Sequence, residues 1–333
     1  MTPRPHALLF EPILKDKVWG GDRLGRLGKR VAPGARVGES WELADLDRTS
    51  PTGGGGDAAR SVVRAGPLAG ATIRDAMRAW GADLLGEARP TDAGGFPLLI
   101  KFLDARTDLS VQVHPSPAHA DRRPGAHLKH EAWRVVAAEP GAVIYRGLRP
   151  GVTHEDLARG AGDGSIVGML LAEPARTGMT YHLPSGVVHA LGAGVLVAEV
   201  QTPSDTTYRL YDWGRRGRAL HVEEALACVF DDAGAQTVPA SALPDARAQE
   251  PTRTDAFIIE PVALAPGASA PMPRPGSPTV MMLLRGSGRI EGAGPALAVS
   301  AGNTALIPAA CARSALIAEA PVEALVVSIP APA

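Results

Sequence analysis

The stretch Leu109-Ser-Val-Gln112-Val-His114-Pro decides how this chain is interpreted. Side chains in a β-strand point alternately to its two faces, so Gln112 and His114 would share one face and the intervening valines the other. Two side chains with lone pairs would then stand beside each other on one wall of a sheet. The stretch therefore predicts a strand that carries part of a metal site.

Two further side chains complete the expected ligand set. They are Glu131 and His189, and His189 ends the run Pro184-Ser-Gly186-Val-Val-His189. A carboxylate and a second imidazole, added to Gln112 and His114, give a mixed nitrogen and oxygen set that suits a divalent transition metal. A single histidine among apolar residues is more often structural than ligating, so the prediction depends on the four side chains occurring together.

Composition limits the classes of partner. The 333 residues include 34 Lys and Arg against 35 Asp and Glu, a balance that favours neither nucleic acid nor an anionic membrane surface. The two cysteines, Cys228 and Cys311, are too few for a disulfide framework. No uninterrupted apolar run reaches the ~18 residues of a membrane span. We expect a cytoplasmic protein that acts on a small polar or anionic molecule and has no nucleic-acid or membrane partner.

The pattern of apolar residues predicts a mainly β protein with a few helices. Short strand-like runs occupy residues 96–103, 109–114, 132–145, 194–201, 280–284 and 325–329, between many glycines and prolines. One helical stripe joins Ile73, Met77, Trp80 and Leu84. Thr153 precedes two acidic residues as at a helix start, and residues 221–228 predict a further short helix.

The distribution of motifs predicts two domains of unequal function. An aperiodic stretch from Asp231 to Asp255 has the composition of a linker. The pattern Gly-x5-Pro-x-Gly-x2-His that ends at His189 returns at residues 302–313, where Ala310 and Arg313 replace the second glycine and the histidine. All nine histidines lie at or before His221. We therefore expect a catalytic, metal-binding domain at residues 1–240 and a degenerate domain without metal ligands at residues 250–333.

Several segments between Trp19 and about His221 resemble the short bacterial form of the type I mannose-6-phosphate isomerases, a family of the cupin superfamily. The most specific is Ser204-Asp-Thr-Thr-Tyr-Arg209-Leu-Tyr-Asp-Trp213. The others are residues 38–42, 96–101, 109–115, 129–133, 188–190 and 199–203. The resemblance implies tandem cupin-type β-barrels of jelly-roll form with a few inserted helices.

The same resemblance implies the activity and the site. It predicts a metal-dependent isomerase that interconverts mannose 6-phosphate and fructose 6-phosphate by moving a proton between C1 and C2 through an enediol-like intermediate. It implies one zinc ion held by Gln112, His114, Glu131 and His189, with Arg209 as the catalytic arginine. The ion would polarise the carbonyl and stabilise the developing negative charge on oxygen.

Residue chemistry suggests roles for two cationic side chains. The permanently charged fork of Arg209 suits electrostatic stabilisation of an enediolate oxygen or a phosphate rather than proton transfer. Lysine is scarce, with five residues against 29 arginines, and Lys129 stands two residues before Glu131. We expect Lys129 to bind the sugar phosphate or a reacting hydroxyl as a compact point charge.

The sequence leaves more than one candidate for the general base and more than one class of function. Glu199, Asp205, His182 and a metal-bound water are all candidates for the base, and the sequence does not rank them. A cupin dioxygenase would use a similar ligand set for iron or manganese. A non-catalytic sugar-binding or regulatory cupin protein is the other alternative. The oligomeric state does not follow from the sequence.

Overall fold

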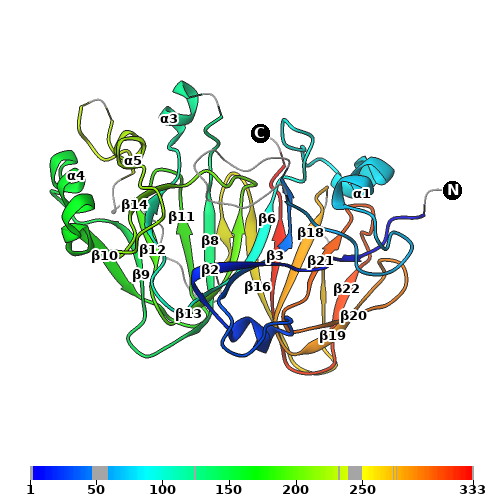
Figure 1. The fold of residues 1–333 in the computed structure, drawn as a ribbon. Coiled ribbons are helices and arrows are strands. Elements are labelled where there is room, and N and C mark those ends of the chain that lie inside the picture. Colours follow the sequence, from blue (N-terminus) through cyan, green and yellow to red (C-terminus); the bar gives the residue numbers. More distant parts are fainter. Residues whose placement is uncertain are drawn as a thin grey trace.

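The computed structural model describes residues 3–46, 59–123, 125–231, 233–238, 250–272, 274 and 276–331. About 40% of the chain is in strands and 15% in helices, which confirms the mainly β prediction. The strands form several antiparallel sheets that pack face to face and are not closed into barrels (Figure 1). Within the part of the chain that is described, no helix is long and apolar enough to cross a membrane.

Two sheets form a first sandwich. In order across it, sheet 1 contains β11 (Thr180–Leu183), β8 (Glu131–Ala138), β13 (Val195–Gln201), β6 (Leu99–Ala105), β2 (Ile13–Gly21) and β3 (Val37–Leu43). Sheet 2 contains β10 (Leu170–Pro174), β9 (Val143–Leu148), β12 (His189–Leu191), β7 (Val111–Val113) and β14 (Tyr208–Tyr211).

Two further sheets form a second sandwich. Sheet 3 contains β1 (Leu8–Leu9), β21 (Thr304–Ile307), β18 (Thr279–Arg285), β23 (Val322–Ser328), β16 (Ile258–Leu264) and β15 (Thr252–Arg253). Sheet 4 contains β17 (Ser269–Pro271), β22 (Ala315–Ala318), β19 (Ser287–Glu291) and β20 (Leu297–Ser300). A separate small ladder pairs β4 (Asp45–Leu46) with β5 (Ala59–Arg60).

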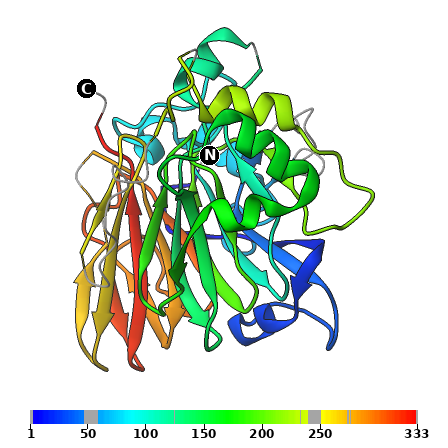
Figure 2. The same ribbon diagram turned by 90° about the vertical axis from the view of Figure 1, so that its left-hand side faces the viewer.

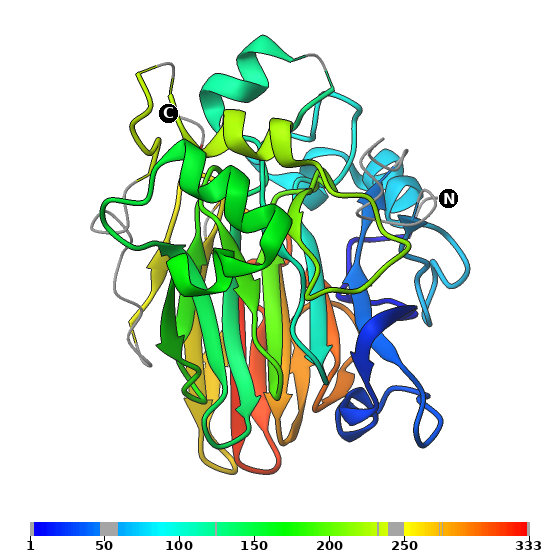
Figure 3. The same ribbon diagram turned by 60° about the vertical axis from the view of Figure 1, so that its left-hand side comes forward.

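The helices lie outside these layers. Helices α4 (His154–Asp163) and α5 (Val222–Val229) cover the outer face of sheet 2, where the side chains of Val111 and Val113 pack against them (Figures 2 and 3). The remaining helical segments are η1 (Arg23–Leu27), α1 (Ile73–Trp80), α2 (Ala82–Leu85), α3 (Pro117–Arg122) and η2 (Ser165–Met169). The predicted start of α4 is confirmed, because Thr153 and Asp156 form a reciprocal capping box.

Alternation along β6 shows how the layers are assembled. Ile100 and Phe102 join a large apolar core shared with Met282 and Val327 of sheet 3, so the two sandwiches lie back to back. Lys101, between them in sequence, points the other way and lines a pocket between sheets 1 and 2. The strand therefore carries structural residues on one face and polar pocket residues on the other.

Two predictions of element boundaries are wrong. The run at residues 132–145 is two strands, β8 and β9, joined by a turn with Gly141 at a φ of 81°. The helical stripe that begins at Ile73 breaks at Gly81, whose φ of 51° is unfavourable for other residues, so α2 is a separate short helix.

The predicted domain boundary between residues 240 and 250 falls largely outside the described residues, and the division into residues 1–240 and 250–333 stays a prediction. One pairing crosses it: β1, near the start of the chain, pairs with β21 in sheet 3. In Figure 1 the dark-blue N-terminal segment accordingly passes across the strands of the second sandwich before it reaches β2.

Candidate metal centre and substrate pocket

Three of the predicted ligands converge between sheets 1 and 2. His114 directly follows β7, His189 begins β12, and Glu131 begins β8 in the facing sheet. One ligand atom from each of these residues lies within 4.8 Å of the others. The Oε2 atom of Glu131 is 3.3 Å from Nε2 of His114 and 3.4 Å from Nε2 of His189. All three side chains are buried, so the cluster is shielded from solvent.

Hydrogen bonds at the far side of each imidazole set the tautomers. Nδ1 of His114 lies 2.9 Å from the carbonyl oxygen of Thr206, and Nδ1 of His189 lies 2.9 Å from that of Val187. A carbonyl oxygen only accepts, so each Nδ1 carries the proton and donates it. The Nε2 lone pairs are then directed at Glu131, as in histidines that bind a metal.

The electrostatics agree with a cation site. Burial and the charge of Lys129 lower the pKa of His114 to about 3, so this imidazole is neutral at physiological pH. Burial would raise the pKa of Glu131, but Lys129 and the two histidines outweigh it and hold the pKa well below the usual range. Oε2 of Glu131 is buried without a hydrogen-bond partner. The neutral imidazole of His114, the imidazole of His189 and an ionised carboxylate with an unused oxygen therefore fit a divalent metal ion.

Gln112, the fourth predicted ligand, lies at the edge of the cluster. Its Nε2 atom is 3.3 Å from Nε2 of His189, and its Oε1 atom accepts a hydrogen bond of 3.3 Å from Ser110. The amide nitrogen therefore faces the cluster. Coordination through the amide oxygen requires a half-turn of the side-chain amide, which distinguishes Gln112 from the three converged ligands.

Lys129 lies beside the cluster rather than at a distance from it. Its Nζ atom is 2.6 Å from Oε1 of Glu131 and 3.4 Å from Nε2 of His114. The residue precedes β8, and its backbone N–H donates to the hydroxyl of Ser185. The ammonium group of Lys129 therefore lies in direct contact with two of the three converged side chains.

Arg209 occupies the same sheet face as two of these residues. Across neighbouring strands, His189 of β12 pairs with Gln112 of β7, which pairs in turn with Arg209 of β14. Such directly opposed side chains stand ~5 Å apart at Cβ. Arg209 is buried, donates from Nη1 to the carbonyl oxygen of Ala219 at 2.8 Å, and leaves Nε without a hydrogen-bond partner. Among the described residues, no ion pair joins Arg209 to a carboxylate.

A second row of polar side chains crosses sheet 1. Glu199 of β13 lies between Trp133 of β8 and Lys101 of β6. It accepts a hydrogen bond of 2.7 Å from Nε1 of Trp133, and its other oxygen is 2.9 Å from Nζ of Lys101. Nζ of Lys101 also donates to Oε1 of Gln201 at 2.6 Å and lies 5.2 Å from the ring of Trp41. Burial raises the pKa of Glu199, and the charge of Lys101 partly offsets this rise.

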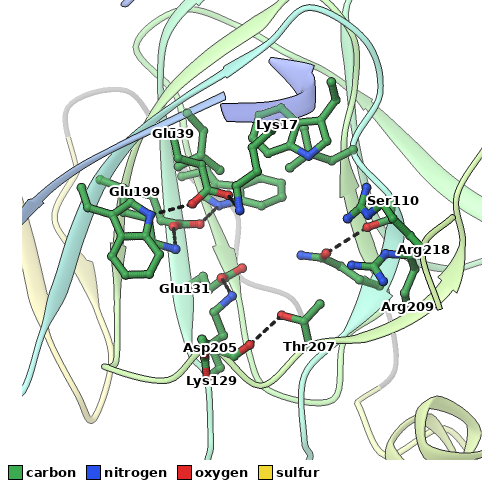
Figure 4. A pocket seen from close by; sticks show the side chains of 17 residues that line it. Lys17, Glu39, Ser110, Lys129, Glu131, Glu199, Asp205, Thr207, Arg209 and Arg218 are labelled. Carbon is green, nitrogen blue, oxygen red and sulfur yellow. Dashed lines mark hydrogen bonds and ion pairs between the residues drawn. The ribbon is translucent and has the colours of Figure 1, made fainter. Parts of the chain in front are cut away.

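Most of the side chains described above line one pocket (Figure 4), but those of His114, His189 and Gln201 are not among its lining residues. Glu39, Glu199 and Glu131 gather on one side of it, and Ser110, Arg209 and Arg218 gather on another. The lining residues are Lys17, Trp19, Glu39, Trp41, Lys101, Leu103, Leu109, Ser110, Gln112, Lys129, Glu131, Trp133, Glu199, Asp205, Thr207, Arg209 and Arg218.

The pocket also identifies residues that the sequence did not. Lys17, Glu39 and Arg218 line it. Glu39 falls in the family-like segment of residues 38–42 but was given no role, and no motif distinguished Lys17 or Arg218 from surface charges. His182, one of the four candidates for the general base, is not among the lining residues. It pairs in register with Ala132, whose side chain belongs to the core on the opposite face of sheet 1. Glu199 and Asp205 do line the pocket.

Comparison with known proteins agrees with this geometry. Residues 9–133 match the model of the catalytic domain of type I phosphomannose isomerases. A probable mannose-6-phosphate isomerase of Bacillus subtilis is 34% identical over 230 residues, 67% of this chain and 68% of the relative. The mannose-6-phosphate isomerase of Streptococcus mutans is 34% identical over 238 residues, 70% of this chain and 71% of the relative.

Solved structures extend the similarity to the whole chain. The crystal structure of mannose 6-phosphate isomerase from Bacillus subtilis superposes with a TM-score of 0.76 at 26% identity and covers 98% of this chain and 100% of its own. The apo form of the Salmonella typhimurium enzyme, at 14% identity and a TM-score of 0.68, supports the fold alone. These neighbours are cupin folds, which confirms that part of the fold prediction. This chain belongs to the family of type I mannose-6-phosphate isomerases.

Proposed function

We propose that this protein is a metal-dependent aldose-ketose isomerase that interconverts mannose 6-phosphate and fructose 6-phosphate. The observation that carries the proposal is the convergence of His114, Glu131 and His189, because Glu131 also lines a pocket that has arginines along another side. Gln112 completes the proposed ligand set. Zinc suits two imidazoles, a carboxylate and an amide oxygen, and when bound it supplies Lewis acidity to the carbonyl of the open-chain sugar.

The arginines define how the substrate would lie. Asp212 accepts from both Arg215, at 2.8 Å, and Arg218, at 3.2 Å, through the same oxygen. Arg209 lies close enough to feel the charges of both arginines and of Asp212, so three guanidinium groups are present near one carboxylate and positive charge is in excess. We assign the phosphate to Arg218 and the hydroxyl of Ser110, because a dianion would balance that excess. The carbonyl end then faces the metal ligands.

Residues around the ligand cluster would stabilise the reacting oxygens. Arg209, which pairs in register with Gln112, directs a buried charge toward the oxygen on which negative charge develops. Lys129, bonded to Glu131, would donate a hydrogen bond to the neighbouring reacting oxygen. Arg209 and Lys129 would stabilise negative charge on oxygen. A different group must therefore take the proton from carbon.

Glu199 is our choice for that group. Trp133 fixes one of its carboxylate oxygens, and the other faces Lys101 within the pocket. Glu199 would take the proton from C2 of the open-chain aldose and return it to C1, while the hydroxyl proton passes from O2 to O1. A pKa raised by burial strengthens the carboxylate as a base, provided that it remains ionised at the working pH.

Turnover in heavy water tests the reaction class. Purified protein with mannose 6-phosphate in D2O should form fructose 6-phosphate with deuterium at C1, measured by NMR, because the base exchanges its proton with solvent. A dioxygenase would instead consume oxygen, which an oxygen electrode records. A non-catalytic sugar-binding protein would bind the sugar phosphate without converting it. Either of these two results would overturn the isomerase proposal.

Cytoplasmic location remains a prediction, supported by the two unpaired buried cysteines, Cys228 and Cys311.

A further inference from the structure

Two of the residues that the sequence did not identify form an ion pair at the pocket wall. Lys17 lies on β2 and Glu39 on the neighbouring strand β3. Nζ of Lys17 is 3.1 Å from Oε1 of Glu39. Figure 4 shows the pair together on a side of the pocket apart from Arg209 and Arg218. Neither residue has a part in the metal centre, the phosphate site or the proton transfer described above.

The carboxylate of Glu39 is held in place. Nε1 of Trp41 donates to Oε2 of Glu39 at 2.6 Å, and Trp41 is itself buried. Burial would raise the pKa of Glu39, but Lys17, Lys101 and the bond from Trp41 outweigh it and lower the pKa to about 2. At physiological pH the group is therefore a fixed, ionised acceptor.

The pair retains unused hydrogen-bonding capacity toward the pocket. A carboxylate oxygen accepts two hydrogen bonds and an ammonium group donates three. In the described structure each oxygen of Glu39 receives one partner, and the ammonium of Lys17 has one. An acceptor and a donor 3.1 Å apart match a sugar hydroxyl, which donates one hydrogen bond and accepts others.

We propose that Lys17 and Glu39 recognise the hydroxyl groups on the middle carbons of the sugar chain and thereby set which hexose phosphates the enzyme accepts. The inference rests on the proposed function, because the metal centre takes the carbonyl end and Arg218 the phosphate. The hydroxyl groups on C3 to C5 are then the part of the sugar for which no binding residue has yet been assigned. A partly buried polar pair that bonds a hydroxyl discriminates against a substrate that lacks the hydroxyl, since the donor and acceptor of the pair are then left without a partner.

Paired substrates and variants test this role. We would measure kcat/KM for mannose 6-phosphate and for its 3-deoxy and 4-deoxy analogues, with wild-type protein, Glu39→Gln and Lys17→Met. The wild type should prefer mannose 6-phosphate over at least one analogue by about tenfold or more. In both variants that preference should collapse, mainly because turnover of mannose 6-phosphate falls while that of the analogue changes little.

Lys15→Gln is the matched control. Lys15 pairs in register with Glu39 and lies 5.2 Å from the ring of Trp41, but it does not line the pocket. Its removal should leave the preference intact. Glu39→Gln and Lys17→Met are scored independently, so misfolding of one variant leaves the other as a test.

The experiment distinguishes failure of the proposed function from failure of the proposed role of Lys17 and Glu39. Wild-type protein that does not convert mannose 6-phosphate would remove the proposed function. Wild-type protein that converts it, with the same preference in both variants as in the wild type, would overturn the role of Lys17 and Glu39 alone.

Discussion

Sheets 1 and 3 lie back to back, and each is covered on its far side by a second sheet, but the two resulting interiors differ. Between sheets 3 and 4 the facing side chains are apolar, for example Leu283, Ile290 and Leu316. Between sheets 1 and 2, Lys101 and Glu131 occupy the corresponding layer. The same layered architecture therefore holds an apolar core in the second sandwich, and in the first it holds a polar pocket beside an apolar cluster that includes Leu103 and Ile144.

The difference shows what a site requires of a β-sandwich. Buried charges are costly unless they are paired. In the first sandwich each buried lysine of the pocket has a carboxylate partner: Lys101 has Glu199, and Lys129 has Glu131. The apolar core shared with sheet 3 supports the strands that carry these groups. We infer that the second sandwich supports the structure of the first through this shared core.

Removing a ligand should have the largest effect. Glu131→Ala and His189→Ala should lose bound metal, measured by elemental analysis, and lower kcat/KM by more than about 10²-fold. Arg313→Ala is the control, since Arg313 takes the position of His189 in the second copy of the repeat. Full metal occupancy in both ligand variants, or metal loss in the control, would contradict a site confined to the first sandwich.

Arg209→Ala should separate charge stabilisation from metal binding. We expect metal content to stay at the wild-type level while kcat falls by about 10²- to 10³-fold, because a buried donor aimed at a developing oxyanion is lost. Steady-state kinetics and elemental analysis on the same preparation measure both quantities. Unchanged turnover would remove Arg209 from the mechanism.

A cavity in the second sandwich should affect stability alone. Leu316 is fully buried between sheets 3 and 4, so Leu316→Ala should lower the free energy of unfolding by about 2–5 kcal/mol. Denaturant unfolding measures this change. At a temperature where the variant is folded, kcat and metal content should equal those of the wild type. A specific loss of metal would show that the second sandwich does more than support the first.

Changing the partner of Glu199 should shift a pH profile. The base must be deprotonated, so activity falls as the pH drops below its pKa. The charge of Lys101 lowers that pKa, and its removal should raise it. Lys101→Met should therefore move the acid limb of the kcat/KM profile to higher pH, with Lys15→Met as the control. An acid limb that stays in place or moves to lower pH would argue against Glu199 as the base.

The sequence predicted those parts of the site that lie on regular strands. Alternation placed Gln112 and His114 on one face of β7, and the spacing of Lys129 and Glu131 brought their charges together. The family resemblance added Arg209, which the strand register places beside Gln112. Zinc as the metal, the ligand role of Gln112 and the catalytic role of Arg209 remain predictions.

Other features depend on tertiary packing and left no signal in the sequence. Lys17 resembles a surface charge, and Glu39 lies in a family-like segment that gave it no role, until the pairing of β2 with β3 places both at the pocket. Leu8 and Leu9 carry no indication that their partner is β21, near the other end of the chain. His182 shares its residue type with the ligands, and only its register with Ala132 shows that it faces away.

One measurement addresses the metal centre and the activity together. Turnover of mannose 6-phosphate by purified protein is recorded as isolated, after removal of metal by a chelator, and after addition of zinc, with bound metal determined at each stage. We predict about one metal ion per chain in the active protein, loss of turnover with loss of metal, and recovery on re-addition. Undiminished turnover by metal-free protein would contradict the central claim.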